Sequence, residues 1–273
     1  MQELSLSAFE RVKPLFHHVR GLHAAVFTVL EGHQAGRVWA DQIANPNTAV
    51  MISDFCYLTS NPGSSDLQAD AVKWLEAEVL HHREYTPIVC LTEPWEAALQ
   101  TILPAYGVQR YVLRKFDLDI QRYRELHTGW QKHIPAGFAL HRLNAQTALD
   151  ADAMAAIWGS VENFLAHGFG FCMLDESQSD AHLAFAASVQ TVFVGDHHAE
   201  TGVETRAAYR RKGLATALCC AYIDHCLQNG IYPEWGCGDD NEPSERLAYK
   251  LGYTNKHEIT MLYVHTPEHL LEK

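Results

Sequence analysis

The segment ETGVETRAAYRRKGLATAL, residues 200–218, is the most informative stretch for the fold expected in the second half of this chain. The residues up to Thr205 are typical of a strand, and a short connector then leads to Gly213 at the start of an apolar helix. The first amides of a helix have no partners inside it, and the helix dipole is positive at that end. Glycine also lets a ligand approach the backbone closely. The segment therefore predicts an anion site, and a pyrophosphate suits it.

The side chains around Gly213 add to this prediction. Arg210, Arg211 and Lys212 precede it, and the small Ala215 and the hydroxyl of Thr216 follow it. The pattern is neither the dinucleotide G-x-G-x-x-G nor the P-loop G-x-x-x-x-G-K-[ST]. Because basic residues beside a helix are also common on solvated surfaces, this motif alone leaves both interpretations open.

A second motif, NEPSERLAYKLGY at residues 241–253, follows about 30 residues later, with the strand-like YPEWGC between the two. In this order and spacing the two motifs resemble the signatures of the GNAT superfamily of acyl-CoA-dependent N-acyltransferases. Arg210, Gly213 and Ala215 stand at the first signature, Q/R-x-x-G-x-G/A. The second signature is matched by Asn241, Ser244, Leu247, Lys250, Leu251, Gly252 and Tyr253. The resemblance covers roughly residues 138–265. Within the superfamily, the sequence is similar to a branch that includes zwittermicin-resistance-like acetyltransferases.

This resemblance implies that acetyl-CoA is the co-substrate. Backbone groups of residues 203–205 would pair with the pantetheine arm, and amides of residues 211–216 would hold the pyrophosphate. Asn241 would contact the pantetheine or the neighbouring loop. The cofactor-binding residues expected on this basis are Val203, Glu204, Thr205, Arg210, Arg211, Lys212, Gly213, Leu214, Ala215, Thr216 and Asn241.

Catalysis by members of this superfamily often uses a glutamate on the same strand, and the resemblance makes Glu200 the candidate base, with Glu204 as the alternate. Residues four apart share one face of a strand unless a bulge intervenes, so alternation does not separate the two. Ala248 stands where many members carry a tyrosine that protonates the thiolate. Tyr249 is next to Ala248 in the sequence, and Ser244 lies one helical turn before it. The sequence does not decide which group acts as the general acid.

The first half of the chain alternates strand and helix patterns, which favours an α/β architecture. Strands are expected at 48–52, 87–91 and 109–116, and helices at 67–82 and 93–103. We expect an N-terminal α/β domain at residues 1–134, on the acceptor side, which would be accessory or a diverged GNAT-like copy. Residues 135–273 would form the GNAT domain, with a mixed, largely antiparallel sheet flanked by helices.

In the second half, strands are expected at 138–143, 182–194, 198–205, 232–237 and 259–264, and helices at 151–165, 212–229 and 243–251. The helix LATALCCAYIDHCL is apolar nearly all the way round, whereas a helix on one sheet face usually has a polar side. It is therefore predicted to be covered on both sides, by the first half or by a second subunit in a homodimer. Its cysteines 219, 220 and 226 are interpreted as buried core residues, and no metal is expected. Trp235 and Cys237 are interpreted as core rather than pocket.

Composition limits the partners. The 273 residues carry a formal net charge of -12, which argues against a general nucleic-acid binder and mildly favours a cationic amine. No apolar run is long enough for a membrane helix, the N-terminus lacks a signal-peptide pattern, and seven cysteines suit a reducing cytoplasm.

The sequence thus predicts an enzyme that transfers acetyl from acetyl-CoA directly to a primary amine of a small molecule in a ternary complex. A CoA-binding sensor or scaffold without catalysis is the alternative, because Ala248 and the uncertain base suit it. Acetylation of a peptide or protein is a third, weaker alternative.

Overall fold

The computed structural model describes residues 1–61, 69–145, 147, 157–180 and 184–272. The chain forms two compact units. The first contains Met1–Arg114 and returns at the end of the chain for Glu258–Lys273, and the second contains Lys115–His257. Two long strands, β6 (Gly107–Leu118) and β12 (Tyr253–His265), each include a point at which the chain passes from one unit to the other.

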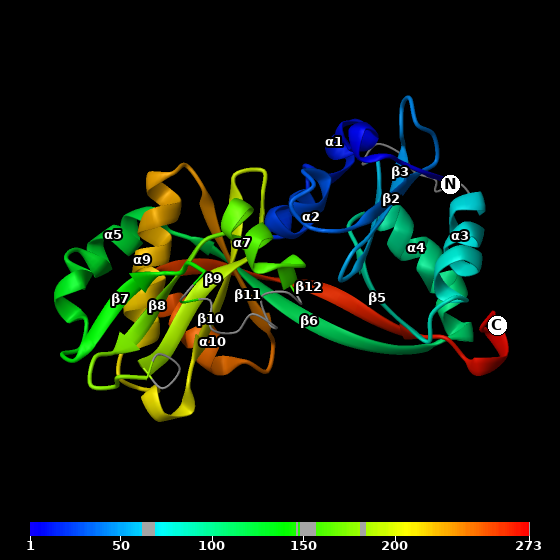
Figure 1. The fold of residues 1–273 in the computed structure, drawn as a ribbon. Coiled ribbons are helices and arrows are strands. Elements are labelled where there is room, and N and C mark those ends of the chain that lie inside the picture. Colours follow the sequence, from blue (N-terminus) through cyan, green and yellow to red (C-terminus); the bar gives the residue numbers. More distant parts are fainter. Residues whose placement is uncertain (62–68, 146, 148–156, 181–183, 273) are drawn as a thin grey trace. The chain divides into compact units, whose positions relative to one another are not determined.

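The first unit has strands in the order β1-β2-β3-β4-β5-β12. Strands β2, β3, β5 and β12 of this unit are labelled in Figure 1. Neighbouring strands are antiparallel, apart from the parallel pair β4 and β5. A helix separates β4 from β5, which is the connection that a parallel pair requires. The strands are β1 (Gln2–Glu3), β2 (Arg37–Ala40), β3 (Thr48–Ile52), β4 (Cys56–Ser60) and β5 (Tyr85–Cys90), and the helices are α1 (Lys13–Phe16), α2 (His23–Leu30), α3 (Ala69–Leu75, continued by a π-helical turn Glu76–Leu80) and α4 (Glu93–Ile102).

The second unit has strands in the order β12-β6-β11-β10-β9-β8-β7. From β7 to β10 the strands form an antiparallel meander. Strand β10 pairs in parallel with β11, and the helix α9 connects the two strands. The remaining elements are α5 (Ile120–His127), β7 (Phe138–Arg142), α7 (Val161–His167), β8 (Gly170–Asp175), β9 (Phe185–Gly195), β10 (His198–Thr205), α9 (Leu214–Gln228), β11 (Tyr232–Gly238) and α10 (Glu242–Leu251). The predicted α/β fold with a mixed, largely antiparallel sheet is confirmed.

Three predicted elements fall partly on residues that are not described. The first part of the helix expected at 151–165 and the beginning of the strand expected at 182–194 lie outside the described residues. The same holds for residues 67 and 68 of the helix expected at 67–82. No helix in the described parts of the chain combines the length and apolar character that crossing a bilayer requires.

The helix α9 is covered on both sides, as predicted. It packs against strands β8 to β11, and its outer side carries α10 and the segment around Trp130. Asp224 of α9 accepts hydrogen bonds from the Tyr123 hydroxyl at 2.7 Å and from the Trp130 indole at 2.8 Å. The three cysteines of this helix are buried, and burial raises the pKa of Cys220 to about 12, so this thiol is a poor nucleophile.

The division into units differs from the expected boundary at residue 134. Residues 115–134 belong to the second unit because α5 and the segment after it supply the cover of α9. The last residues belong to the first unit because residues 261–265 of β12 pair with β5. The sequence pattern gave no sign of this return, since an isolated strand does not reveal its partner.

Replacing Asp224 with Ala should lower the free energy of unfolding by about 2–4 kcal/mol, because it leaves two largely buried donors without their charged acceptor. Asp224→Asn is the matched control, since it keeps Oδ1 as an acceptor toward Tyr123 and should lose less. Urea unfolding measures both values. A loss below about 0.5 kcal/mol for Asp224→Ala would show that the helix is held by apolar packing alone.

Candidate functional site

Strands β10 and β11 separate in the middle of the second unit. Their parallel pairing joins His198 with Tyr232, Ala199 with Pro233 and Glu200 with Glu234, and the paired register ends there. Residues 201–205 continue along β9 on their other side. The edge of β10 that faces β11 therefore opens directly after Glu200, which leaves strand-like backbone for an extended ligand to pair with.

The strand register also shifts at this point. The pairing of β10 with β9 shifts by one residue between Ala199 and Thr201, around Glu200. Such an irregularity re-aims the side chains beside it. Glu200 keeps 15% of its side chain exposed, whereas Glu204, farther along the strand, is exposed. The two glutamates that strand alternation could not separate thus differ in their surroundings.

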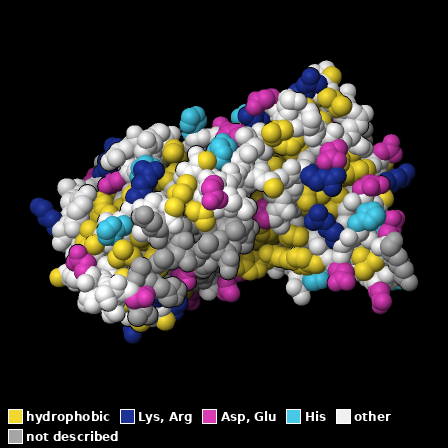
Figure 2. Space-filling view, in the orientation of Figure 1, with side chains coloured by type: hydrophobic (Ala, Val, Ile, Leu, Met, Phe, Trp, Pro, Cys, Tyr) yellow, Lys and Arg dark blue, Asp and Glu magenta, His cyan; other side chains and the backbone are white. Residues whose placement is uncertain are grey.

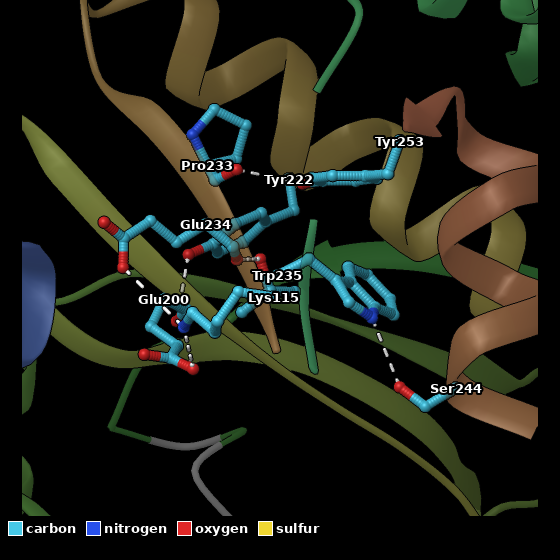
Figure 3. Close-up of polar contacts among 9 residues, drawn as sticks. Lys115, Glu200, Tyr222, Pro233, Glu234, Trp235, Ser244 and Tyr253 are labelled. Atoms are coloured by element: carbon cyan, nitrogen blue, oxygen red, sulfur yellow. Dashed lines mark hydrogen bonds and ion pairs between the residues drawn. The ribbon is translucent and has the colours of Figure 1, made fainter. Parts of the chain in front are cut away.

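A buried ammonium group lies beside Glu200. The Nζ of Lys115, on β6, donates to Oε1 of Glu200 at 2.8 Å and lies 3.8 Å from Oε2 of Glu234 on β11 (Figure 3). The side chains of Lys115 and Glu234 are only 1% and 3% exposed. Lys115 thus lies within ion-pair distance of two carboxylates, and removing one partner of a buried ion pair is strongly destabilising.

A glycine makes room for this cluster. A Cβ at Gly236 of β11 would lie 2.8 Å from Cδ and 3.0 Å from Nζ of Lys115, and 3.1 Å from Oε1 of Glu200. Contacts below 3.0 Å force a neighbour to move. The absence of a side chain at this position is therefore what allows the ammonium and the carboxylate to meet.

The backbone on both sides of the cluster is held in place. The buried Tyr222 of α9 donates its hydroxyl to the carbonyl of Glu200 at 3.3 Å. Thr201 donates its hydroxyl to the carbonyl of Glu234 at 2.9 Å. Because these bonds reach the main chain, they fix the strands and leave the carboxylates for other partners.

The start of α9 has the conformation that an anion site needs. Gly213 precedes the helix with a φ of 86°, and among the described residues no side chain caps this end. A Cβ at Gly213 would meet no atom within 4 Å, so open space lies before the first turn. Arg211 also has a positive φ of 63°, an uncommon conformation for a residue with a side chain. The structure is thus consistent with amides of residues 211–216 as an anion-binding turn.

The cations of this turn have defined positions. Arg210 donates from Nε to the carbonyl of Thr205 at 3.1 Å, which ties the turn to the end of β10. The Nζ of Lys212 lies 5.0 Å from the ring centre of Tyr209 and 5.6 Å from that of Phe138, both favourable cation–π distances. Ala215 and Thr216 are half-buried, and Leu214 anchors the turn in the core.

Residues from the second motif have structural roles in the described part of the chain. Asn241 caps α10, since its side chain accepts from the amide of Ser244 at 3.2 Å. Ala248 is fully buried, and the exposed Tyr249 donates its hydroxyl to Glu245. The Ser244 hydroxyl accepts from the Trp235 indole at 3.2 Å, which leaves its own proton to donate (Figure 3). The contact of Asn241 with a cofactor stays a prediction.

Trp235 and Cys237 are buried in the core of the second unit, as interpreted from the sequence. Sequence reasoning did not find Lys115, Glu234 or Gly236. One signal was available, because a lysine in the strand expected at 109–116, between Arg114 and Phe116, is unusual inside a protein unless its charge is paired.

Comparisons with known proteins identify the family of this chain. A family model described as GNAT acetyltransferase matches residues 13–262, which include the first half, where the sequence motifs gave no signature. The chain is similar to the "Uncharacterized N-acetyltransferase YdfB" of Bacillus subtilis (strain 168), with 26% identity over 275 residues that cover 96% of this chain and 98% of the relative.

Two solved structures share the fold over nearly the whole chain. A GCN5-related N-acetyltransferase-like protein from Streptococcus suis 89/1591 has a TM-score of 0.63 at 21% identity, covering 95% of this chain and 99% of that one. A tandem GNAT protein from the clavulanic acid biosynthesis pathway has a TM-score of 0.67 at 14% identity, covering 98% of both chains.

Proposed function

The chain belongs to the GNAT acetyltransferase family, and we propose that it transfers an acetyl group from acetyl-CoA to a primary amine of a small molecule. The observation that carries this proposal is that the pairing of β10 with β11 ends at Glu200 and Glu234. Strand β10 then continues toward the turn at Gly213, where α9 begins. This arrangement combines an open strand edge, an anion-binding turn and a carboxylate within one stretch of chain.

The residues present suit a coenzyme A ester. The backbone of residues 203–205 would pair with the pantetheine amides like an added strand. Amides of the first turn of α9 would bind the pyrophosphate, and the open space at Gly213 leaves room for it. The thioester supplies the activated acetyl group, and an amide near Val203 would polarise its carbonyl.

Glu200 would act as the base. Amine acylation needs a neutral nitrogen, so a proton must leave the acceptor. Lys115 engages Oε1 of this carboxylate, so Oε2 is the atom that we assign to the amine or to a bridging water. The amine would attack the thioester directly in the ternary complex, without a covalent enzyme intermediate. With Ala248 at the usual tyrosine position, water would reprotonate the departing thiolate.

We propose a cationic small amine as the acceptor class, since the net charge of -12 steers cations toward the molecule. On the visible face, Lys and Arg side chains are scattered among acidic ones instead of forming a basic stripe (Figure 2). This distribution supports a partner other than nucleic acid.

A non-catalytic sensor of acetyl-CoA is the second candidate, and the buried Ala248 favours it. Release of CoA decides between the two. The purified protein is incubated with acetyl-CoA and, in separate reactions, spermidine, tyramine, histamine, lysine and glucosamine, and free thiol is followed with a colour reagent. An enzyme releases CoA faster with at least one amine than without any. Binding of acetyl-CoA with no amine-dependent release would favour the sensor.

A further inference from the structure

We propose that Lys115 is a positioning residue for acetyl transfer, which holds the carboxylate of Glu200 in the orientation from which it takes the proton of the acceptor amine. The inference rests on the proposed function, and it concerns a strand outside both sequence motifs. Figure 3 shows the Lys115 ammonium between the carboxylates of Glu200 and Glu234.

The two glutamates differ in their distance from Lys115 and in their exposure to solvent. Lys115 donates to Glu200 at 2.8 Å, a full hydrogen bond, whereas its 3.8 Å separation from Glu234 is only an ion-pair distance. Glu234 is 3% exposed and Glu200 is 15% exposed. The ammonium is thus directed at the carboxylate that an acceptor can reach, and Glu234 is its second, more distant partner.

A purely structural role explains the cluster less well. Buried ion pairs are expensive to desolvate, and apolar side chains of similar volume often stabilise a core equally well or better. Here three strands each contribute to the arrangement, and β11 provides Gly236 where any side chain would collide with the pair. The cluster also lies at the residue where the β10–β11 ladder opens. A costly group at this position suggests a chemical role.

The proton balance of the step is simple. A protonated amine first gives one proton to Oε2 of Glu200 and becomes neutral. Its nitrogen then forms a bond to the acetyl carbon, the carbon–sulfur bond breaks, and the electron pair leaves with sulfur. The second proton of the nitrogen passes through water to the CoA thiolate. Lys115 keeps its own protons throughout and gives only a directed hydrogen bond.

The first test changes the geometry without changing a charge. Gly236→Ala places a methyl group 2.8 Å from Cδ of Lys115 and 3.1 Å from Oε1 of Glu200. Both are far ends of long side chains, so the protein can fold by displacing the pair. We expect kcat with the best amine to fall about 10- to 100-fold, because small misplacements of a reacting group have effects of this size. The KM for acetyl-CoA should stay unchanged.

The matched control is Gly36→Ala, which crowds the Val29 side chain in the first unit, whereas the charged cluster belongs to the second unit. It should affect stability similarly and leave kcat within about twofold of the wild type. An unchanged kcat in Gly236→Ala, with a folded protein, would overturn the role of Lys115.

The second test asks whether Lys115 acts through Glu200. Lys115→Met should lower kcat strongly in the wild type but by less than about threefold in a Glu200→Gln background, because residues that work as one unit are not additive. Equal losses in both backgrounds would mean a role independent of Glu200. If the wild type releases no CoA with any of the amines, the proposed function fails as well. If the wild type turns over and both Gly236→Ala and Lys115→Met turn over equally fast, only this inference fails.

Discussion

Replacing Glu200 with Gln should lower kcat for amine acetylation by about 10²- to 10⁴-fold, the range that general-base catalysis contributes. In the wild type, Nζ of Lys115 donates to Oε1 of Glu200 at 2.8 Å. Glutamine has the same shape and keeps an oxygen that can accept this hydrogen bond, so the fold should persist. It has no carboxylate to take the proton of the amine. Steady-state CoA release gives kcat, and the melting temperature with acetyl-CoA checks that binding is retained.

Glu204→Gln is the comparison that identifies the base. Glu204 is exposed and lies farther along β10, past the point where the register shifts. We expect the larger loss of kcat at Glu200. A larger loss at Glu204 would assign the base to that residue, and equal small losses in both would favour an amine that is deprotonated by water alone.

Replacing Lys115 with Met should have the largest effect on stability, a loss of about 3–5 kcal/mol in the free energy of unfolding. The side chain is 1% exposed, and its removal takes the ammonium away from two carboxylates that are 15% and 3% exposed. Equilibrium unfolding in urea at neutral pH measures the loss.

Two further variants show whether charge is the cause. Lys256→Met is the matched control, since it removes the same group from an ion pair with Glu245 at 3.1 Å, but its side chain is 36% exposed. Exposed pairs contribute about 1 kcal/mol or less. Adding Glu234→Gln to Lys115→Met should restore part of the stability, because one buried negative charge is then removed. A loss near 1 kcal/mol for Lys115→Met, unaffected by Glu234→Gln, would contradict the buried-charge account.

The motifs predicted the part of the site that is local in sequence. The strand 198–205, the turn at Gly213 and the following helix lie within one segment, and glycine and hydrophobic spacing locate them. The position of Glu200 at a register shift depends on the pairing of β10 with β9, which the sequence of β10 alone does not contain.

The partners of Glu200 come from distant segments. Lys115 precedes Glu200 by 85 residues, and Glu234 belongs to the strand after α9. Their meeting depends on the strand order of β6, β11 and β10, and no local pattern fixes that order. The boundary at residue 134 differed from the observed division for the same reason, since α5 and the final strand residues choose partners far away in the chain.

Thermal unfolding with acetyl-CoA shows whether coenzyme A binds at the start of α9. At 100 times the dissociation constant a ligand stabilises by about 2.7 kcal/mol, which should raise the melting temperature by about 5 °C. Gly213→Leu should abolish this shift, because its side chain enters the space before the first turn.

Gly230→Leu provides the control at the other end of the same helix, about 22 Å away along its axis. Gly230 also has a positive φ, of 68° against 86° for Gly213, and open space around its Cβ position, so both variants carry similar backbone strain. We predict a shift in the wild type and in Gly230→Leu, and none in Gly213→Leu. An equal shift in all three proteins, or no shift in the wild type at millimolar acetyl-CoA, would contradict a CoA site at the start of α9.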